Sequence, residues 1–570
     1  MKEKIYKFLK KEYPGLDFDV SYPPGDLGDY STNVAFLSAK QKGQNPQKMA
    51  QEISARLEKE FLNEFEKIET AKGGFINLYL SKAYLQSNLP GALEIPAAGQ
   101  KKTVIIEYSQ PNIAKTMHVG HLRSTILGDA LANIYEALGH RVIRWNYLGD
   151  WGTQFGKLIA AYKMWGSGDE VKKNPIETLN NLYVRFHEEM RARPDLEEKG
   201  REEFKKLEEG DRENKKLWEW FKDESLKEFD KIYGLLGVKF NTDIGESFFT
   251  NDTKPLVKEL KDKGAAQESE GALIINLDEF GLPPALIQKA DGASLYLTRD
   301  IAALKYRIKE YRPEKIIYVV GNEQSLHFQQ LFAVAKIIGL DGWGLSHVKF
   351  GLILGEDKKK LSSREGRVVA IKYLIDKSIE LAGKIVEEKN TELSGEEKKE
   401  ISRAVGIGAL KYFILKEHRN TDIVFDWDKI LDFKGDTGPY LQYTYARLAG
   451  IKKKFQNLDI SKPKNFETLN KKIESLNPET LNKEVELSLM KKIIKFPEAV
   501  VMAAEHNLSN VLTLYLYELC NLANKFYESA PVLQEEDEKV RSARLGLVNL
   551  TGSVLEKGLG LLGIRAPERI

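Results

Sequence analysis

The chain of 570 residues contains a single cysteine, Cys520, and this scarcity excludes two kinds of architecture. One thiol cannot form an internal disulfide framework, and it cannot build a cysteine-rich zinc cluster. We therefore expect a protein of a reducing compartment that has no protein-bound zinc and no metal site of its own. Cys520 is predicted to be a small core residue.

Long hydrophobic runs are also missing. The N-terminal segment MKEKIYKFLKKEYPGLDF is basic, but it lacks the apolar stretch of about seven residues or more that a secretion signal needs. No segment approaches the roughly 18 consecutive apolar residues of a membrane span. These two absences predict a cytoplasmic protein that has no membrane partner.

An excess of charge of either sign is absent too, because 86 Lys and Arg residues nearly balance 84 Asp and Glu residues. Any RNA-binding surface must therefore come from local segregation of charge. With 42% hydrophobic and 30% charged residues, the composition is that of a folded globular protein. The length exceeds what one hydrophobic core usually supports, so we expect several domains.

The pattern of the first two thirds of the chain predicts two domains. Residues 1–90 begin with a Lys-rich amphipathic helix and end in the alternating stretch GGFINLYL, which is typical of a small α+β domain. Within residues 100–370, TVIIEYS, a helical segment and RVIRWNYLG follow one another, which predicts a Rossmann-like α/β domain with a doubly wound parallel sheet. A densely charged segment at about 165–240 predicts a helical insertion with solvated faces.

Helical patterns dominate the rest of the chain. Residues 371–435 form a predicted helical connecting region, in which Ser394 and Glu397 have the spacing of a capping box. Residues 436–570 are nearly all amphipathic helix, which predicts an all-α C-terminal domain.

The most informative tetrapeptide is His118-Val119-Gly120-His121, which lies where the first predicted strand of the α/β domain leads into its helix. In an open parallel sheet, ligands bind at the carboxyl ends of strands, beside helix N-termini whose free amides favour phosphate. The two imidazoles can donate to phosphate oxygens, and Gly120 leaves room for a nucleotide. This pattern predicts an ATP site, although paired histidines on a helix are also common as ordinary core or surface residues.

A lysine-rich loop, GEDKKKLSSREG, follows the predicted strand VKFGLIL. Lysines and serine hydroxyls on a loop can gather round a triphosphate and neutralise the charge that grows on leaving pyrophosphate. A charged loop alone is usually only solvated, so its occurrence together with HVGH is what indicates function.

Together, the two motifs resemble the signatures of class I aminoacyl-tRNA synthetases. His118–His121 match the HIGH motif, and Lys360-Leu361-Ser362-Ser363-Arg364 match KMSKS in the same order along the chain. The surrounding segments resemble the arginyl-tRNA synthetase family over nearly the whole length. They are GDYSTNVAF, EYSQPNIAKTMHVGHLRST, WNYLGDWGTQFGKL, LYLTRDIAAL, YVVGNEQSLHFQQ, DTGPYLQYTYARL and LGLLGIRAPER.

The resemblance implies an enzyme that activates L-arginine with ATP, giving arginyl-adenylate and pyrophosphate. It then transfers the arginyl group to the 3′-terminal ribose of arginine tRNA and releases AMP. Mg²⁺ would accompany the ATP. The four parts would be an accessory tRNA-binding domain that contacts the tRNA elbow, a class I catalytic domain, a stem-contact region and an anticodon-binding domain. Family habit favours a monomer, and the chain shows no coiled-coil seam.

The same resemblance assigns the nucleotide site. ATP-binding residues would be His118, Gly120, His121, Lys360, Leu361, Ser362 and Ser363, and all of these except Leu361 would be catalytic. Two positions depart from the family pattern, because Arg364 replaces the last lysine and Glu365 puts an acid beside it. We hypothesise that Lys115, just before HVGH, supplies the missing catalytic phosphate contact; the alternative is a solvated loop lysine.

Choice of the amino acid follows from guanidinium chemistry, because a planar fork of five donors needs carboxylates and hydroxyls fixed in its plane. Tyr296 and Asp300 would share one face of a helix, and they match the family's side-chain pocket; Glu246 is a weaker third candidate. The positions that match the α-amino and carboxylate end are Glu107, Asn112 and Gln324. Each of these could instead be a structural polar residue.

Aromatic and basic residues alternate in PYLQYTYARLAGIKKKF, within the part that resembles an anticodon-binding module. Unpaired bases are typically recognised by stacking and by hydrogen bonds to their edges. The candidate tRNA-binding residues are Tyr440, Tyr443, Tyr445 and Arg447. Aromatic spacing on a helix more often indicates core packing, and that alternative stays open for each of them.

Three other functions remain open on the sequence alone. A nucleotidyltransferase also begins a helix with HxGH, but such enzymes are generally shorter and lack a helical C-terminal domain. A catalytically silent paralogue that only binds RNA could retain both motifs, and charging with lysine or glutamine is a third alternative.

Overall fold

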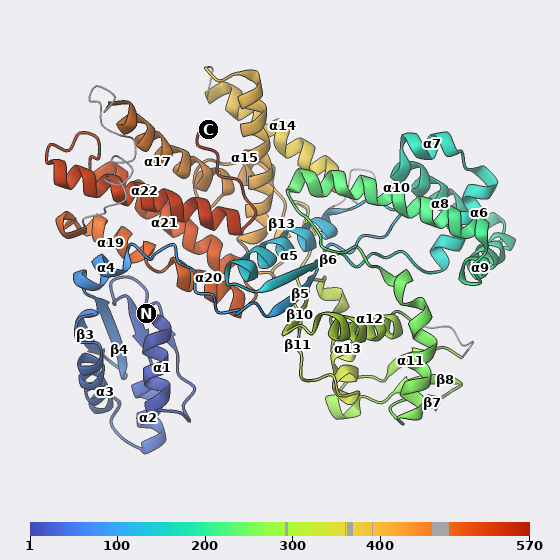
Figure 1. The fold of residues 1–570 in the computed structure, drawn as a ribbon, viewed down its shortest axis with the longest axis horizontal. Coiled ribbons are helices and arrows are strands. Elements are labelled where there is room, and N and C mark those ends of the chain that lie inside the picture. Colours follow the sequence, from blue (N-terminus) through green and yellow to red (C-terminus); the bar gives the residue numbers. More distant parts are fainter. Residues whose placement is uncertain (291–294, 360, 362–368, 390–391, 459–477) are drawn as a thin grey trace.

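The computed structural model describes residues 1–290, 295–359, 361, 369–389, 392–458 and 478–570, and Figure 1 shows their arrangement. Lys360, Ser362 and Ser363 of the predicted phosphate loop lie outside the described residues. A parallel sheet lies at the centre of the molecule. An N-terminal α+β domain, a helical arm and a helical C-terminal domain surround it, as Figure 1 shows. The predicted fold class is confirmed.

The N-terminal domain is an antiparallel sheet with strand order β1-β2-β4-β3. Apolar residues at helical spacing, such as Ile5 and Leu9, are buried in its core. Its elements are α1 (Lys2–Glu12), β1 (Val20–Ser21), β2 (Tyr30–Thr32), α2 (Val34–Lys42), α3 (Pro46–Glu60), β3 (Phe65–Ala71), β4 (Phe75–Leu80) and α4 (Lys82–Asn88).

The central sheet has the order β11-β10-β5-β6, and all its pairings are parallel. From β5 the chain moves outward to β6, and from β10 it moves outward to β11 in the other direction. The order therefore reverses between β5 and β10, and such a reversal is where ligands bind in open α/β sheets. The elements are β5 (Thr103–Glu107), α5 (Val119–Ala137), β6 (Arg141–Trp145), α12 (Tyr296–Tyr311), β10 (Lys315–Tyr318), η3 (Asn322–Gln324), α13 (Ser325–Ile337), β11 (Gly344–His347) and β12 (Ile353–Leu354).

Two insertions separate β6 from α12. The first is helical and consists of α6 (Thr153–Trp165), α7 (Gly168–Lys173), α8 (Pro175–Ala192), α9 (Asp195–Glu208) and α10 (Arg212–Leu236). The second adds a small antiparallel sheet that the sequence analysis did not anticipate. It consists of η1 (Glu246–Phe249), α11 (Thr250–Asp262), β7 (Gln267–Ser269), β8 (Ala272–Ile275), η2 (Asp278–Phe280) and β9 (Ala285–Gln288).

The remaining elements are mostly helices, as predicted. They are α14 (Ile371–Lys389), α15 (Gly395–Leu415), β13 (Ile423–Val424), α16 (Trp427–Ile430), α17 (Gly438–Leu458), η5 (Pro478–Thr480), α19 (Glu484–Ile493), α20 (Phe496–Glu505), α21 (Ser509–Ser529) and α22 (Glu538–Leu561). The capping box predicted for Ser394 and Glu397 is confirmed at the start of α15. Cys520 is a buried free thiol in α21, also as predicted.

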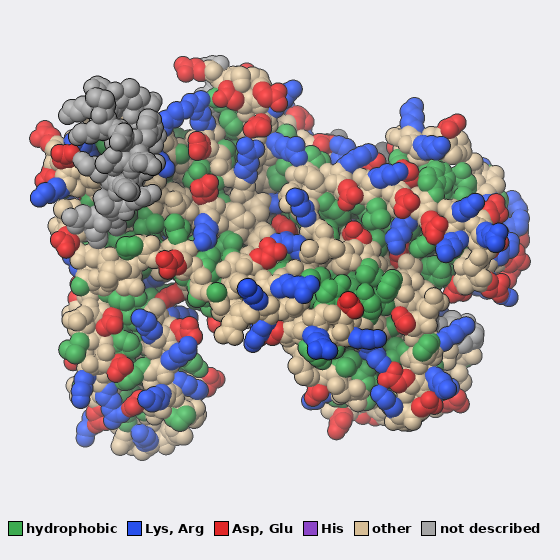
Figure 2. Space-filling view, in the orientation of Figure 1, with side chains coloured by type: hydrophobic (Ala, Val, Ile, Leu, Met, Phe, Trp, Pro, Cys, Tyr) green, Lys and Arg blue, Asp and Glu red, His purple; other side chains and the backbone are tan. Residues whose placement is uncertain are grey.

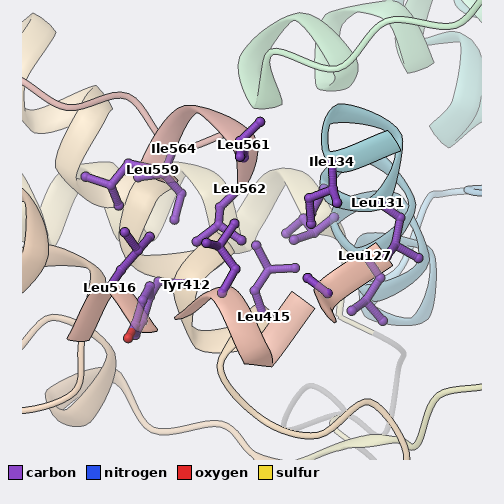
Figure 3. Packing of buried hydrophobic residues seen from close by; sticks show 14 of the residues in the cluster. Leu127, Leu131, Ile134, Tyr412, Leu415, Leu516, Leu559, Leu561, Leu562 and Ile564 are labelled. Atoms are coloured by element: carbon purple, nitrogen blue, oxygen red, sulfur yellow. The ribbon is translucent and has the colours of Figure 1, made fainter. Parts of the chain in front are cut away.

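Helix α5 belongs to the cores of both the central sheet and the C-terminal domain. Figure 3 shows Leu127, Leu131 and Ile134 of α5 in one cluster with Leu415 of α15 and Leu562, which follows α22. A buried polar contact crosses the same interface. Lys411 of α15 lies 3.9 Å from Asp129 of α5 and donates to the carbonyl of Gly563 at 2.7 Å.

The surface has mixed charge. Figure 2 shows Lys and Arg side chains interspersed with Asp and Glu over the visible face. In the part of the chain that the structure describes, no helix has the length and apolarity needed to cross a membrane.

Candidate active site

The HVGH motif forms the first turn of α5, at the carboxyl end of β5. Nδ1 of His118 accepts the N–H of Gly120 at 3.2 Å, and Nδ1 of His121 accepts the N–H of His118 at 3.1 Å. Because Nδ1 is an acceptor in each ring, the proton of each neutral imidazole lies on Nε2, which becomes a donor. Burial and the adjacent His118 lower the pKa of His121 to about 3, so this ring is neutral near pH 7.

The two rings lie side by side, with centroids 3.8 Å apart. Gly120 permits this arrangement, because a Cβ there would lie only 3.1 Å from Cε1 of His118. Two imidazole donors and the positive end of the α5 helix dipole thus gather at one place, which is suited to binding phosphate.

Leu361 of the predicted phosphate loop and Val369, which follows the loop, are both anchored near HVGH. Within the loop, the N–H of Leu361 donates to the carbonyl of Ile353 on β12, which pairs with β13 in a small sheet. After it, the carbonyl of Val369 accepts the N–H of Val119 at 3.2 Å. The chain therefore returns from the loop directly onto the first turn of α5.

Arg123, two residues after HVGH, holds the base of the same loop. Its guanidinium donates to the carbonyls of Leu352 at 2.9 Å, Thr421 at 2.8 Å and Arg419 at 3.1 Å. Only 1% of the side chain is exposed. Arg123 therefore links α5 to β12, which leads into the loop, and to the segment before β13.

Lys115 points toward the helical insertion. Its Nζ donates to Oε1 of Gln154 at 2.9 Å and lies 4.9 Å from the centre of the Tyr183 ring on α8. Burial lowers the pKa of this ammonium. Lys115 is thus close to HVGH in sequence, and its side chain packs against α6 and α8.

Tyr296 and Asp300 lie on the first two turns of α12, so the helix predicted for them is confirmed. Oδ2 of Asp300 lies 2.6 Å from Nε2 of His327 on α13. Tyr296 is 58% exposed, and the Arg299 guanidinium packs over its ring at 4.8 Å.

Glu246, from η1, adds a second carboxylate to this region. Burial raises its pKa to about 8, and Asp300 and Asp150 act in the same direction, while Arg299 opposes them from 3.1 Å. The nearby hydroxyl of Tyr147 is buried and has no hydrogen-bond partner among the residues that the structure describes. A carboxyl group with a raised pKa, a second carboxylate and a hydroxyl that lacks a partner among the described residues form a site that a multivalent cationic donor would stabilise.

The three residues predicted for the other end of the substrate follow the carboxyl ends of β5 and β10, where the strand order reverses. Glu107 forms a buried ion pair with Arg307 and accepts from Gln110 at 2.8 Å. Asn112 packs closely on Gly149, where a Cβ would lie 2.1 Å from its Oδ1. Gln324 is exposed on η3.

Asp150 is a structural residue of the site that the sequence analysis missed. Its fully buried carboxylate accepts from Lys222 of α10 at 2.7 Å, and from the N–H and hydroxyl of Ser247 at 2.8 and 2.7 Å. It thereby connects the helical insertion to η1, which carries Glu246. His327, Arg307 and Arg123 were also missed, because their partners are distant in sequence. His327 and Arg123 lie inside quoted motifs, whereas Arg307 follows LYLTRDIAAL by three residues and lies in none of them.

The candidate tRNA-binding residues occupy different environments on α17. Tyr445 is 8% exposed and packs in the core, a placement that favours a structural role. The Tyr440 hydroxyl donates to Asn521 at 2.8 Å and accepts from Asn524 at 3.0 Å. Arg447 lies 5.2 Å from the ring centre of Tyr443 and 5.1 Å from that of Tyr527, at the wall of a cavity of about 1220 Å³ that Ile570 also lines.

Three family models match the chain. Residues 1–80 match the arginyl tRNA synthetase N terminal domain, residues 84–427 match the catalytic domain of class I (R) tRNA synthetases, and residues 441–570 match the DALR anticodon binding domain. Together they cover nearly the whole sequence.

Similar proteins agree with these models over the full length. An arginine–tRNA ligase of Bacillus cereus is 43% identical over 564 residues, covering 97% of this chain and 96% of its own. That of Halothermothrix orenii is 39% identical over 587 residues, covering 100% and 99%. Among solved structures, the arginyl-tRNA synthetase of Plasmodium falciparum has a TM-score of 0.84 at 29% identity, covering 100% and 99%. That of Thermus thermophilus has a TM-score of 0.84 at 25% identity, covering 100% of both chains.

Proposed function

This chain belongs to the arginyl-tRNA synthetase family and is an arginine–tRNA ligase, and we propose that the crevice above β5 and β10 holds both of its small substrates. ATP, carrying Mg²⁺ as part of the substrate, lies against the first turn of α5. L-Arginine lies between β5, η1 and α12. In the first step, the arginine carboxylate attacks the α-phosphate and pyrophosphate leaves.

In this proposal, His118 and His121 donate from Nε2 to the phosphate oxygens, and the amides at the start of α5 add fixed dipoles. Such donors accelerate a reaction because they are aimed in advance at charge that develops in the transition state. Lys360, Ser362 and Ser363 would also contact the phosphates. Val369, the described residue that follows this loop, lies on the first turn of α5, where its carbonyl accepts the N–H of Val119. Lys115, in the segment before α5, would contact the same phosphates.

The arginine side chain is held by Asp300, Tyr296 and Glu246. A carboxylate forms two parallel hydrogen bonds with a guanidinium fork, and these bonds are strong because both groups are charged. The single ammonium of lysine cannot form the same pair of bonds. Glu107, Asn112 and Gln324 face the α-amino and carboxylate end. The observation that supports this assignment is that Asp300 lies close enough to Glu246 to raise its pKa, beside a Tyr147 hydroxyl that has no hydrogen-bond partner among the described residues.

Transfer of the arginyl group requires arginine tRNA, whose anticodon would meet the cavity walled by Tyr443, Arg447 and Tyr527. Tyr440 borders this region, and the N-terminal domain would contact the tRNA elbow. We propose that the enzyme acts in the cytoplasm as a monomer.

Replacing Asp300 with Asn tests the pocket. The amide keeps the size of the side chain but removes its charge and one acceptor, so the KM for arginine should rise about 100-fold or more. The measurement is ATP–pyrophosphate exchange with arginine and with lysine, each with and without arginine tRNA. Asp376→Asn, an exposed aspartate on α14, is the matched control. An unchanged KM in Asp300→Asn would remove Asp300 from the pocket.

The same assay separates an active ligase from an inactive RNA-binding relative. Exchange with arginine is expected from the wild-type enzyme. Retained tRNA binding without exchange under any condition would show that this chain has lost the activity of its family.

A further inference from the structure

His327 contacts Asp300, the side chain on which the proposed arginine pocket depends. His327 lies on the first turn of α13, and its Nε2 is 2.6 Å from Oδ2 of Asp300 on α12. The two side chains are 25% and 24% exposed, so the contact lies at the wall of the crevice and not in the core. A carboxylate that must bind a substrate cation is therefore already in contact with a titratable group of the protein.

The surroundings of His327 favour its charged form. Burial alone lowers the pKa of His327, but Asp300 on α12 and Glu107 at the end of β5 outweigh this effect and raise it above 6.5. On β11, His347 is neutral near pH 7, because burial lowers its pKa to about 4. Glu323 of η3 is also charged, and its carboxylate packs on Gly321.

The substrate and this imidazolium compete for the same oxygen. A guanidinium fork uses both oxygens of a carboxylate, and Oδ2 of Asp300 is the one that His327 contacts. A second cation beside the same carboxylate disfavours the proton on His327. Arginine and that proton therefore oppose each other at one site.

We propose that His327 is a positioning residue of the arginine pocket, which holds Asp300 while the pocket is empty and loses its proton to solvent when the guanidinium takes Oδ2. The inference rests on the proposed function, in which Asp300 binds the guanidinium. By linkage, the apparent affinity for arginine falls up to about tenfold for each pH unit below the point at which His327 is half protonated.

Glu246 is a second source of protons that the experiment has to separate. Its pKa of about 8 means that the empty pocket holds a proton there at pH 7, and a bound cation favours its loss. The His327→Gln variant retains Glu246, so the difference in proton release between this variant and the wild type isolates the share that comes from His327.

The test is calorimetric titration of the full-length enzyme with arginine, in two buffers that differ in ionisation enthalpy, between about pH 5 and pH 8. It is run with and without arginine tRNA. The wild type should release one more proton than His327→Gln at the acid end, and the difference should vanish at the alkaline end. Glutamine keeps a neutral donor toward Asp300, so its arginine affinity should stay within about tenfold of wild type at the alkaline end.

Two further variants make the result specific. His347→Gln, the neighbouring histidine on β11, should keep the wild-type proton count. Glu246→Gln should still release the proton assigned to His327, so this variant tests the inference even if His327→Gln fails to fold.

Equal proton release by wild type and His327→Gln, or no release by Glu246→Gln at acid pH, would overturn the inference. If Asp300→Asn still weakens arginine binding in that case, Asp300 remains assigned to the pocket and only the inference about His327 is wrong. If Asp300→Asn leaves arginine binding unchanged, both the assignment and the inference are wrong.

Discussion

At the scale of single residues, the proposed nucleotide site depends on neutral histidines whose hydrogen bonds fix their tautomers. Nδ1 of His121 accepts the N–H of His118, so Nε2 of His121 carries the proton and is the donor. The two functions of the ring can be separated, because an asparagine amide reproduces the Nδ1 position and a glutamine amide reproduces the Nε2 position.

We predict that His121→Asn keeps the cap but loses the outer donor, and slows adenylate formation about 100- to 1,000-fold. His121→Gln should retain more activity and lose more thermal stability. Because its pKa is lowered to about 3, His121 is neutral from about pH 5 to pH 8, so the ratio of wild-type to His121→Asn rates should be constant over this range. ATP–pyrophosphate exchange and thermal melting measure both effects, and equal exchange rates would exclude His121 as a donor.

The role of Lys115 is tested in the same way. Its ammonium has a lowered pKa and donates to Gln154, a contact that a phosphate can replace. Lys115→Ala should reduce the rate of adenylate formation at least tenfold with little change in the KM for arginine. Lys173→Ala, an exposed lysine on α7, is the control, and unchanged exchange in Lys115→Ala would leave this residue as a solvated loop lysine.

At the scale of elements, the sequence predicted those whose pattern is local. The strand–helix–strand unit around α5, the helix under Tyr296 and Asp300, and the cap at Ser394 each follow from periodicity or spacing of neighbouring residues. The small sheet from β7 to β9 has strands of three or four residues, too short for alternation to be visible. The pair of His327 with Asp300 joins residues 27 positions apart, and only the fold determines such a contact.

Arg123 shows how an element is positioned by one side chain. Its three hydrogen bonds to carbonyls join α5 to β12 and β13, and hydrogen bonds to charged groups contribute about 1.5–3 kcal/mol each. We predict that Arg123→Met speeds hydrogen exchange at 351–354 and 419–425 and lowers kcat for adenylate formation. Arg141→Met, an exposed residue of β6, should change neither. Unaltered exchange in both segments would show that β12 and β13 do not depend on Arg123.

At the scale of the whole molecule, buried polar contacts hold the N-terminal domain against the C-terminal helices. Glu498 of α20 accepts from the Tyr22 hydroxyl at 2.7 Å and from the N–H of Lys2 at 2.9 Å. Asp29 pairs with Lys491 at 2.9 Å and with Lys495 at 3.3 Å. Because these contacts connect the two ends of the chain, they set the distance between the two outer domains that are proposed to bind tRNA.

Glu498→Gln should loosen this docking, because a neutral amide accepts more weakly than a carboxylate and adds donors where only donors are present. Burial acts to raise the pKa of Glu498, but the N-terminal amino group and the hydrogen bonds of Lys2 and Tyr22 lower it below 4.5. The stabilisation is therefore complete above pH 4.5 and is lost as the pH falls through the lower value. We expect faster hydrogen exchange in α1 and β2 and a higher KM for arginine tRNA, with the KM for ATP unchanged. Glu505→Gln, on the exposed side of the same helix, is the control, and identical exchange in both variants would show that Glu498 does not hold the domains together.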